Sequence, residues 1–177
     1  MNKRKSIIRQ TTESGFTLLI AALIASIVLS LASAIFSIAK KQVALSSLSQ
    51  QSQYAFYASD TAAECALYWD VRFGYFAPVT PVLPAPFTVP VCDTQPLVVT
   101  NTNPGTYPYM MSFEFEPNGV CAKVTIQKCQ GTISEAGVCT FNGATVSTKI
   151  HVDGFNTSCA TISTNPIALE RSVEVDY

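Results

Sequence analysis

The most constraining feature of the sequence is an uninterrupted apolar run near its amino-terminal end. The 24 residues from Phe16 to Ala39 include no charged side chain. As a helix rising about 1.5 Å per residue they would be roughly 36 Å long, enough to cross a hydrocarbon core of about 30 Å. Four basic residues precede the run, and Lys40 and Lys41 follow it. The pattern predicts one membrane-spanning helix whose amino-terminal end lies in the cytoplasm.

The charge distribution argues against a nucleic-acid-binding domain. Of the 11 basic and 12 acidic residues, four basic and one acidic lie before Gly15, which leaves the chain from Phe16 onward net acidic. Domains that bind nucleic acid usually present a basic patch, so no direct nucleic-acid binding is expected. A length of 177 residues gives room for one domain and an appendage.

The helical pattern continues beyond the two lysines, without proline or glycine, as far as Gly74. Small and apolar side chains recur there at steps of three and four residues, at Ala55, Ala58, Ala62, Cys65 and Trp69. Glutamines and acidic residues occupy the opposite side. This spacing is typical of an amphipathic helix. Residues 40–73 are therefore predicted to form the amphipathic half of one long helix, with 16–39 as its transmembrane half.

Residues 74–110 are predicted to be a connecting segment. Eight prolines lie between Ala77 and Pro108. Each proline lacks a backbone donor, so a regular helix or a central strand is excluded there. We expect an ordered loop, extended in places, between the helix and a sheet.

From residue 111 onward apolar and polar residues alternate with a period of two. In "MSFEFEPNGVCAKVTIQKC" Phe113 and Phe115 alternate with glutamates, and Asn118-Gly119 indicates a tight turn before a second run. Two further runs alternate in the same way, "ATVSTKIHVDGF" and "LERSVEVDY". Four strands, each with one apolar face, predict an α+β fold: the long helix packed on a four-stranded antiparallel sheet over residues 111–177.

All six cysteines follow the apolar run. They are Cys65, Cys92, Cys121, Cys129, Cys139 and Cys159. An even number behind an export-type amino terminus favours disulfides, with free buried thiols as the alternative. Cys129 and Cys139 bracket "QGTISEAGV", and a bridge closing that loop is favoured, with Cys65–Cys92 and Cys121–Cys159 completing the set. Six cysteines allow 15 connectivities, so this pairing is a hypothesis.

No pattern typical of an enzyme is present in the sequence. It has no GxSxG, Walker loop, HExxH or GxGxxG motif, and without CxxC and with a single histidine it lacks zinc-site spacing. That residue, His151, is expected on the polar face of the sheet beside Lys149 and Asp153, as an ordinary surface histidine. We expect no enzyme activity, catalytic residue, cofactor or metal.

The junction before the apolar run resembles a known targeting signal. "SGFTLLI", Ser14 to Ile20, places a Gly-Phe step after a short basic leader and before one long apolar helix. This arrangement resembles the class III signal of type IV prepilins and pseudopilins, over residues 1 to about 70. Ala55 to Trp69 also resembles the segment after the membrane helix in minor pilins of the PilX-like kind. The resemblance implies that a prepilin peptidase removes residues 1–15, cutting between Gly15 and Phe16, and methylates the new amino group of Phe16.

One residue departs from the family pattern, and the departure bears on where the subunit would lie in a filament. Most pilins have a glutamate as the fifth mature residue, where this chain has Ile20. In the family that carboxylate is thought to meet the amino terminus of a neighbouring subunit, and an isolated carboxylate in hydrocarbon is costly. Subunits without it include the tip minor pseudopilin and some minor pilins. By resemblance, Ile20 favours a tip or initiating subunit.

The resemblance implies a minor structural subunit of a type IV pilus or of a type II secretion-like filament. Its expected partners are other pilin subunits, the prepilin peptidase and the inner-membrane assembly platform. The chain would be held in the cytoplasmic membrane by a single pass, with an extracytoplasmic domain that becomes extracellular after filament assembly. The sequence does not distinguish among motility, adhesion, secretion and DNA uptake, and it names no ligand.

Two other classes of protein remain open. A permanently anchored extracytoplasmic binding domain would keep its leader and stay in the membrane. A secreted, adhesin-like domain would be cut after the small residues Ala32-Ser33-Ala34.

Overall fold

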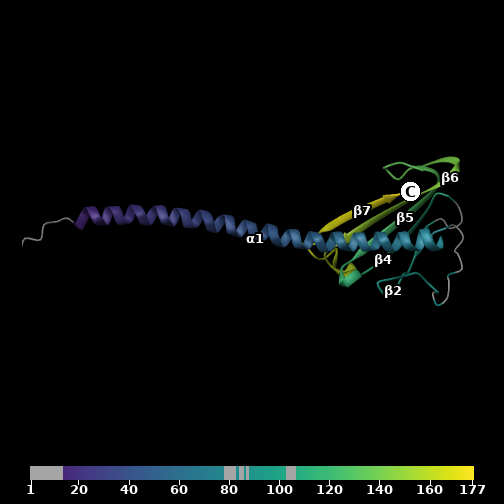
Figure 1. Cartoon of the computed structure of the whole chain (residues 1–177), viewed down its shortest axis with the longest axis horizontal. Coiled ribbons are helices and arrows are strands. Elements are labelled where there is room, and N and C mark those ends of the chain that lie inside the picture. The colour runs from purple at the N-terminus through teal and green to yellow at the C-terminus, as the bar shows by residue number, and fades with distance from the viewer. Residues whose placement is uncertain (1–13, 78–82, 84–85, 87, 103–106) are drawn as a thin grey trace, which may run out of the picture. The chain divides into compact units, whose positions relative to one another are not determined.

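The computed structural model describes residues 14–77, 83, 86, 88–102 and 107–177. The leader expected at residues 1–15 lies outside this part of the chain, apart from Ser14 and Gly15. The described chain divides between Ser47 and Leu48 into two compact units. Its helix and strands are α1 Ser14–Phe73, β1 Val91–Cys92, β2 Gln95–Pro96, β3 Thr100–Thr102, β4 Tyr109–Phe115, β5 Ala122–Ile133, β6 Cys139–Phe155 and β7 Glu170–Asp176 (Figure 1).

The first unit consists of the amino-terminal part of α1. Every side chain from Phe16 to Ala39 is exposed. α1 is the one helix of the described chain that is long and apolar enough to cross a membrane, judged by length and composition.

The second unit is a five-stranded antiparallel sheet with the carboxyl-terminal part of α1 packed on one face. The strand order is β3-β4-β5-β6-β7, so strands that are consecutive in sequence are neighbours in the sheet. Figure 1 shows the helix lying along this sheet. The core between them contains Trp69 from the helix and alternate residues of the strands, among them Tyr109, Phe113, Ile126 and Val152. The predicted α+β arrangement of a long helix on an antiparallel sheet is confirmed.

The helix approaches the sheet closely because small residues line the contact. The predicted stripe is confirmed, since Ala55, Ala58 and Ala62 are fully buried. On β6 the facing residue is Gly154. A Cβ atom placed there would lie 2.1 Å from the carbonyl oxygen of Ala55 and 2.6 Å from the backbone nitrogen of Ser59. Glycine at this position allows the two backbones to meet.

The predicted number of four strands is wrong, because the main sheet has five. The additional strand, β3, lies within the segment that was predicted to be a loop. It pairs along the outer side of β4, with Thr100 opposite Ser112. An edge strand needs hydrogen bonds on one side only, so a short strand is tolerated between nearby prolines. The same segment contains the two-stranded sheet of β1 and β2.

The expected turn at Asn118-Gly119 is confirmed. A short 3₁₀ turn, Pro117–Gly119, joins β4 to β5, and Asn118 and Gly119 both have positive φ angles of 53° and 78°. The strand boundaries differ by a few residues from those expected. β4 begins at Tyr109, two residues before the expected start of the sheet, and β5 begins at Ala122.

β5 and β6 continue beyond the five-stranded part as a hairpin arm, residues 129–147. In the arm these two strands pair with each other, while the β4 and β7 pairings end at Lys128 and Lys149. Val146 alternates in phase with the buried Ile150 and Val152 of the same strand, but it lies in this arm and is 47% exposed. The side chains of α1 that bury Ile150 and Val152 do not cover Val146.

Candidate functional site

The junction residues of the proposed signal lie in the first turns of α1. Gly15 has no atom within 4 Å of the position a Cβ would take. Phe16 is 71% exposed and Ile20 is 41% exposed. The helix is therefore regular at Gly15 without needing a glycine there. The structure places these three residues on one helix.

Three serine hydroxyls within the apolar segment are satisfied inside the helix. The hydroxyls of Ser26, Ser30 and Ser33 each donate to a backbone carbonyl three residues earlier, at 2.8 Å. Such internal bonds remove the cost of placing an unpaired hydroxyl in hydrocarbon. At the carboxyl end of the segment the ammonium of Lys40 lies 4.5 Å from the ring centroid of Phe36. These contacts suit the segment to an apolar environment.

In the second unit α1 also carries apolar side chains on the side that faces away from the sheet. Tyr54, Tyr57, Tyr68 and Val71 are each more than half exposed. They follow one another at helical spacing, interrupted by Thr61 and Glu64 in the same series. A shallow groove beside this helix face is lined by Tyr54, Tyr57, Ala58, Thr61, Pro117, Asn118 and Val120. The helix thus has a core-facing side and an exposed aromatic side.

Three disulfides brace the second unit. Cys65–Cys92 joins α1 to β1, Cys121–Cys159 joins the residue before β5 to the segment between β6 and β7, and Cys129–Cys139 closes the hairpin arm. These are the pairs favoured in the sequence hypothesis. Their Cα–Cα distances of 6.0, 4.7 and 5.7 Å fall in the usual range for disulfides. They fit a domain that folds in an oxidising compartment.

A buried polar cluster connects the end of α1 to the sheet. The ammonium of Lys128 on β5 donates to Asp70 Oδ2 at 2.6 Å and to the hydroxyl of Thr148 at 3.0 Å. The hydroxyl of Tyr177 donates to the same Asp70 oxygen. Burial raises the pKa of Tyr177. Sequence periodicity did not identify this cluster, although Lys128 follows Val124 and Ile126 on the apolar face of its strand and so carried a signal of burial.

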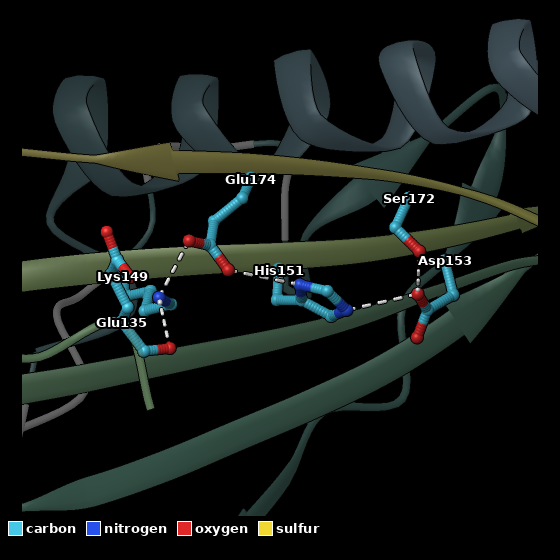
Figure 2. A network of polar contacts seen from close by, with 6 residues as sticks. All are labelled: Glu135, Lys149, His151, Asp153, Ser172 and Glu174. Carbon is cyan, nitrogen blue, oxygen red and sulfur yellow. Dashed lines mark hydrogen bonds and ion pairs between the residues drawn. The ribbon is translucent and has the colours of Figure 1, made fainter. Parts of the chain in front are cut away.

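A second polar network lies on the opposite face of the sheet (Figure 2). His151 was expected on this face beside Lys149 and Asp153, and that is confirmed. Nε2 of His151 lies 3.0 Å from Asp153 Oδ1, and Nδ1 lies 3.3 Å from Glu174 Oε2 on β7. The ammonium of Lys149 lies 2.7 Å from Glu174 Oε1, and the hydroxyl of Ser172 donates to Asp153 Oδ1 at 2.6 Å.

The hydrogen bond from Lys149 is the main cause that lowers the pKa of Glu174, and the same bond raises the pKa of Lys149. Sequence alternation located His151 and Lys149 on this face. It did not identify Glu174 as their partner, because that pairing depends on the register between β6 and β7.

The geometry of these polar groups does not provide a metal centre. In the described part of the chain the one cluster of potential ligands is Glu114, Cys121 and Cys159. Its two cysteines are bonded to each other, so their sulfurs are not available as thiolates. Around His151 the two carboxylates lie at different ring nitrogens, so one cation bound to either nitrogen would not reach both in this arrangement.

Comparisons with models of known protein families, with curated proteins and with solved structures found no match to the chain. The apolar helix, its junction and the disulfide-braced domain are therefore the features on which a function can be proposed.

Proposed function

We propose that the chain is a minor subunit of a type IV pilus or of a related pseudopilus, with a structural function. The observation that carries the proposal is the construction of α1. Its first half presents 24 consecutive uncharged residues from Phe16 to Ala39, all exposed, and its second half packs on an antiparallel sheet. Such a chain needs an apolar environment for one half and folds its own core around the other.

The same exposed segment suits both states that a filament subunit occupies. Before assembly, lipid tails would cover the apolar side chains of residues 16–39. After assembly, the corresponding helices of neighbouring subunits would cover them. Both environments are dry and apolar, so transfer between them does not require the helix to change. The internally bonded hydroxyls of Ser26, Ser30 and Ser33 support this, since they need no partner in either state.

The exposed aromatic side of α1 in the second unit supports contacts with other pilin subunits. Tyr54, Tyr57 and Tyr68 would otherwise leave large apolar rings in water. Side chains of this kind are enriched at protein–protein contacts, where the ring is covered and the hydroxyl stays wet. The proposed partners are therefore other pilin subunits, together with the inner-membrane assembly platform and the prepilin peptidase.

We further propose that the subunit lies at the tip or in an initiating complex. This depends on Ile20, which occupies the position where most pilins have a glutamate. A subunit without that carboxylate has no buried charge to be neutralised by docking beneath a neighbour. In this proposal residues 1–15 are a leader, Phe16 is the methylated first residue, and the chain has no catalytic role.

Fractionation of the native host tests the proposal. Surface filaments are sheared from the cells, and the membrane, filament and medium fractions are analysed by quantitative mass spectrometry. The expected result is a membrane pool together with a small, reproducible amount in the filament fraction relative to the main pilin. Presence in the membrane alone, in cells with abundant filaments, would indicate a permanently anchored domain. Free protein in the medium would indicate a secreted domain.

A further inference from the structure

β7 is an edge strand of the main sheet, and among the described strands it pairs with β6 alone. Its seven residues, Glu170–Asp176, include no proline or glycine, and their register with β6 runs without a bulge. None of the seven is buried. Proteins usually shorten, bend or interrupt such an edge, because its unpaired backbone groups can accept a further strand. The opposite edge strand, β3, is short, with three residues. β7 is therefore the long and regular edge of this sheet.

The hydrogen bonds between β6 and β7 show which backbone groups point to the outer edge. Tyr177 and Thr148 exchange two backbone hydrogen bonds, of 2.7 and 3.0 Å. At the other end of the strand the amide of Asn156 donates to the carbonyl of Leu169 at 3.2 Å. In an antiparallel ladder such bonded pairs alternate with pairs that exchange no hydrogen bond. The odd-numbered residues of β7 therefore bond to β6, and the even-numbered ones direct N–H and C=O outward. These outward residues are Glu170, Ser172, Glu174 and Asp176.

The side chains of the outward residues lie on the polar face of the sheet and form an acidic row along its edge. Three of the four are carboxylates. Glu174 pairs with Lys149 on β6 at 2.7 Å. Asp176 lies opposite the same lysine in the strand register, and Glu170 lies opposite Phe155. The row thus has more negative than positive charge, which favours basic side chains on a strand laid beside it.

The face of this edge that is turned toward α1 is largely apolar. Val173 and Val175 pack against the core but remain half-buried. Nε of Arg171 donates to the hydroxyl of Ser52 at 2.8 Å, so α1 runs beside β7. Phe56 lies one turn further along the same side of the helix and is 47% exposed. An added strand would therefore meet apolar surface on this face and carboxylates on the other.

We propose that β7 is a docking edge for an extended segment of a partner protein, which adds a sixth strand to the sheet through backbone hydrogen bonds. The segment that fits alternates basic side chains, facing the acidic row, with apolar side chains facing α1. The edge belongs to the second unit alone, so the docking does not depend on the function proposed above. It would hold for an anchored or a secreted domain with this fold.

A second copy of β7 does not fit this edge. If two copies paired antiparallel over their full length, Glu170 of each would lie opposite Asp176 of the other. A shift by two residues in one direction places Glu170 opposite Glu174, and a shift in the other direction places Glu174 opposite itself. Like charges directly opposite each other are destabilising. The charges of β7 therefore select a basic partner strand over self-association.

Hydrogen exchange of the full chain in uncharged detergent micelles tests the docking edge. The probe is a peptide as long as β7, blocked at both ends, in which lysine alternates with valine. Without it, the amides of Ser172, Glu174 and Asp176 should exchange fast. With the peptide at about ten times its dissociation constant, these amides should gain about tenfold in protection, because the edge is then free about a tenth of the time. The amide of Val124, in the central strand β5, is the reference and should not change.

Matched peptides separate strand addition from other modes of binding. N-methylation of alternate residues along the pairing edge removes the donors of the peptide and leaves its charge unchanged. Replacement of each lysine by glutamate keeps the donors and reverses the charge. Each change should weaken binding by about tenfold or more, since several hydrogen bonds or charge pairs are lost together.

A matched pair of variants tests the edge from the side of the protein. Ser172→Pro removes an outward donor and no bond to β6, a position where an edge strand tolerates proline. Ser172→Ala loses the same hydroxyl but keeps the donor. We expect Ser172→Pro to weaken peptide binding about tenfold or more and Ser172→Ala to change it by less than about twofold. The amide of Val173 should stay protected in both variants, as evidence that β7 still pairs with β6.

Three results would overturn the inference. The first is an unchanged exchange rate of the outward amides at about 1 mM lysine peptide, which would mean that the edge has no useful affinity for a strand. The second is equal binding of the lysine and glutamate peptides, which would mean that the acidic row does not select the partner. The third is protection of the outward amides that rises with protein concentration in the absence of peptide. That result would assign the edge to a second copy of the chain.

Discussion

Asp70, in the last turn of α1, and Lys128, on β5, form an ion pair with Oδ2 and Nζ 2.6 Å apart and with both side chains almost fully buried. The pair lies at the point where the long helix ends against the sheet. Thr148 accepts a second hydrogen of the ammonium and Tyr177 donates to the carboxylate, so both charges have further partners. This cluster fixes the end of the helix on the sheet by specific polar contacts.

Removing one member of this pair should strongly destabilise the domain. We expect Lys128→Met to lower the free energy of unfolding by about 3–5 kcal/mol, because Asp70 is left as an unpaired buried charge. The double variant Asp70→Leu/Lys128→Met should recover most of the loss, since it buries no charge. Urea unfolding of the oxidised chain in micelles measures both. A double variant as unstable as the single one would show that the cost comes from packing rather than from the unpaired charge.

Gly154 should be intolerant of a side chain. In Gly154→Ala the new methyl group would overlap backbone atoms of Ala55 and Ser59, which cannot move aside as a flexible side chain would. We expect a loss of about 3 kcal/mol or more, at the upper end of overpacking effects. Gly143→Ala is the control: it has open space around the added carbon but a φ of +77°, so it should cost about 1–2 kcal/mol. Similar thermal unfolding curves for the two variants would contradict the close approach of α1 to β6.

These features mark the limit of what the sequence could predict. Residue periodicity predicted the helix as far as Gly74, its buried alanines and the alternation of Phe113 with Glu114. These features depend only on which side of a helix or strand a residue faces. They did not predict β3. Its three residues, Thr100–Thr102, are polar and close to prolines, and they form a strand only because the edge of β4 is open beside them.

The polar clusters depend on relations that a single sequence does not contain. Asp70 and Lys128 are 58 residues apart and meet only once the helix is placed on the sheet. His151 and Glu174 meet because β6 and β7 pair in one particular register, and a shift of one residue would turn Glu174 to the other face. Cysteine spacing was more informative. The favoured bridge between Cys129 and Cys139 needed only a short loop. The four remaining cysteines allow three pairings, so Cys65–Cys92 and Cys121–Cys159 were a hypothesis that their spacing did not determine.

The three disulfides should differ in their contribution to stability. Their sequence separations are 10, 27 and 38 residues for Cys129–Cys139, Cys65–Cys92 and Cys121–Cys159. In the chain-entropy model, closing the shortest of these loops contributes about 3 kcal/mol to stability, and closing the longest contributes about 4 kcal/mol. Replacing each pair by two serines should therefore cost least for Cys129–Cys139 and most for Cys121–Cys159, as judged by urea unfolding. The reverse order would show that local packing outweighs loop closure.

The Lys149–Glu174 ion pair should make the stability of the fold depend on pH in the acidic range. The pKa of Glu174 is lowered in the folded state, so its contribution is present above the usual carboxyl range and is lost as pH falls through the folded-state value. The stability difference between the wild type and Lys149→Met should therefore shrink between pH 6 and pH 3. Lys123→Met, which removes an exposed lysine on the same face, should show no such trend. A constant difference for Lys149→Met would mean that the ion pair does not stabilise the fold.

The most direct test of the central claim is the amino-terminal sequence and intact mass of the protein isolated from its native host membranes. The proposal predicts a chain that begins at a methylated Phe16, with its mass lowered further by six hydrogens for the three disulfides. Gly15→Leu should remain uncut, although Gly15 has open space around it and the helix would tolerate the change. A native chain that begins at Met1, or at Ile35 after secretory cleavage, would contradict the assignment to a pilin-like filament.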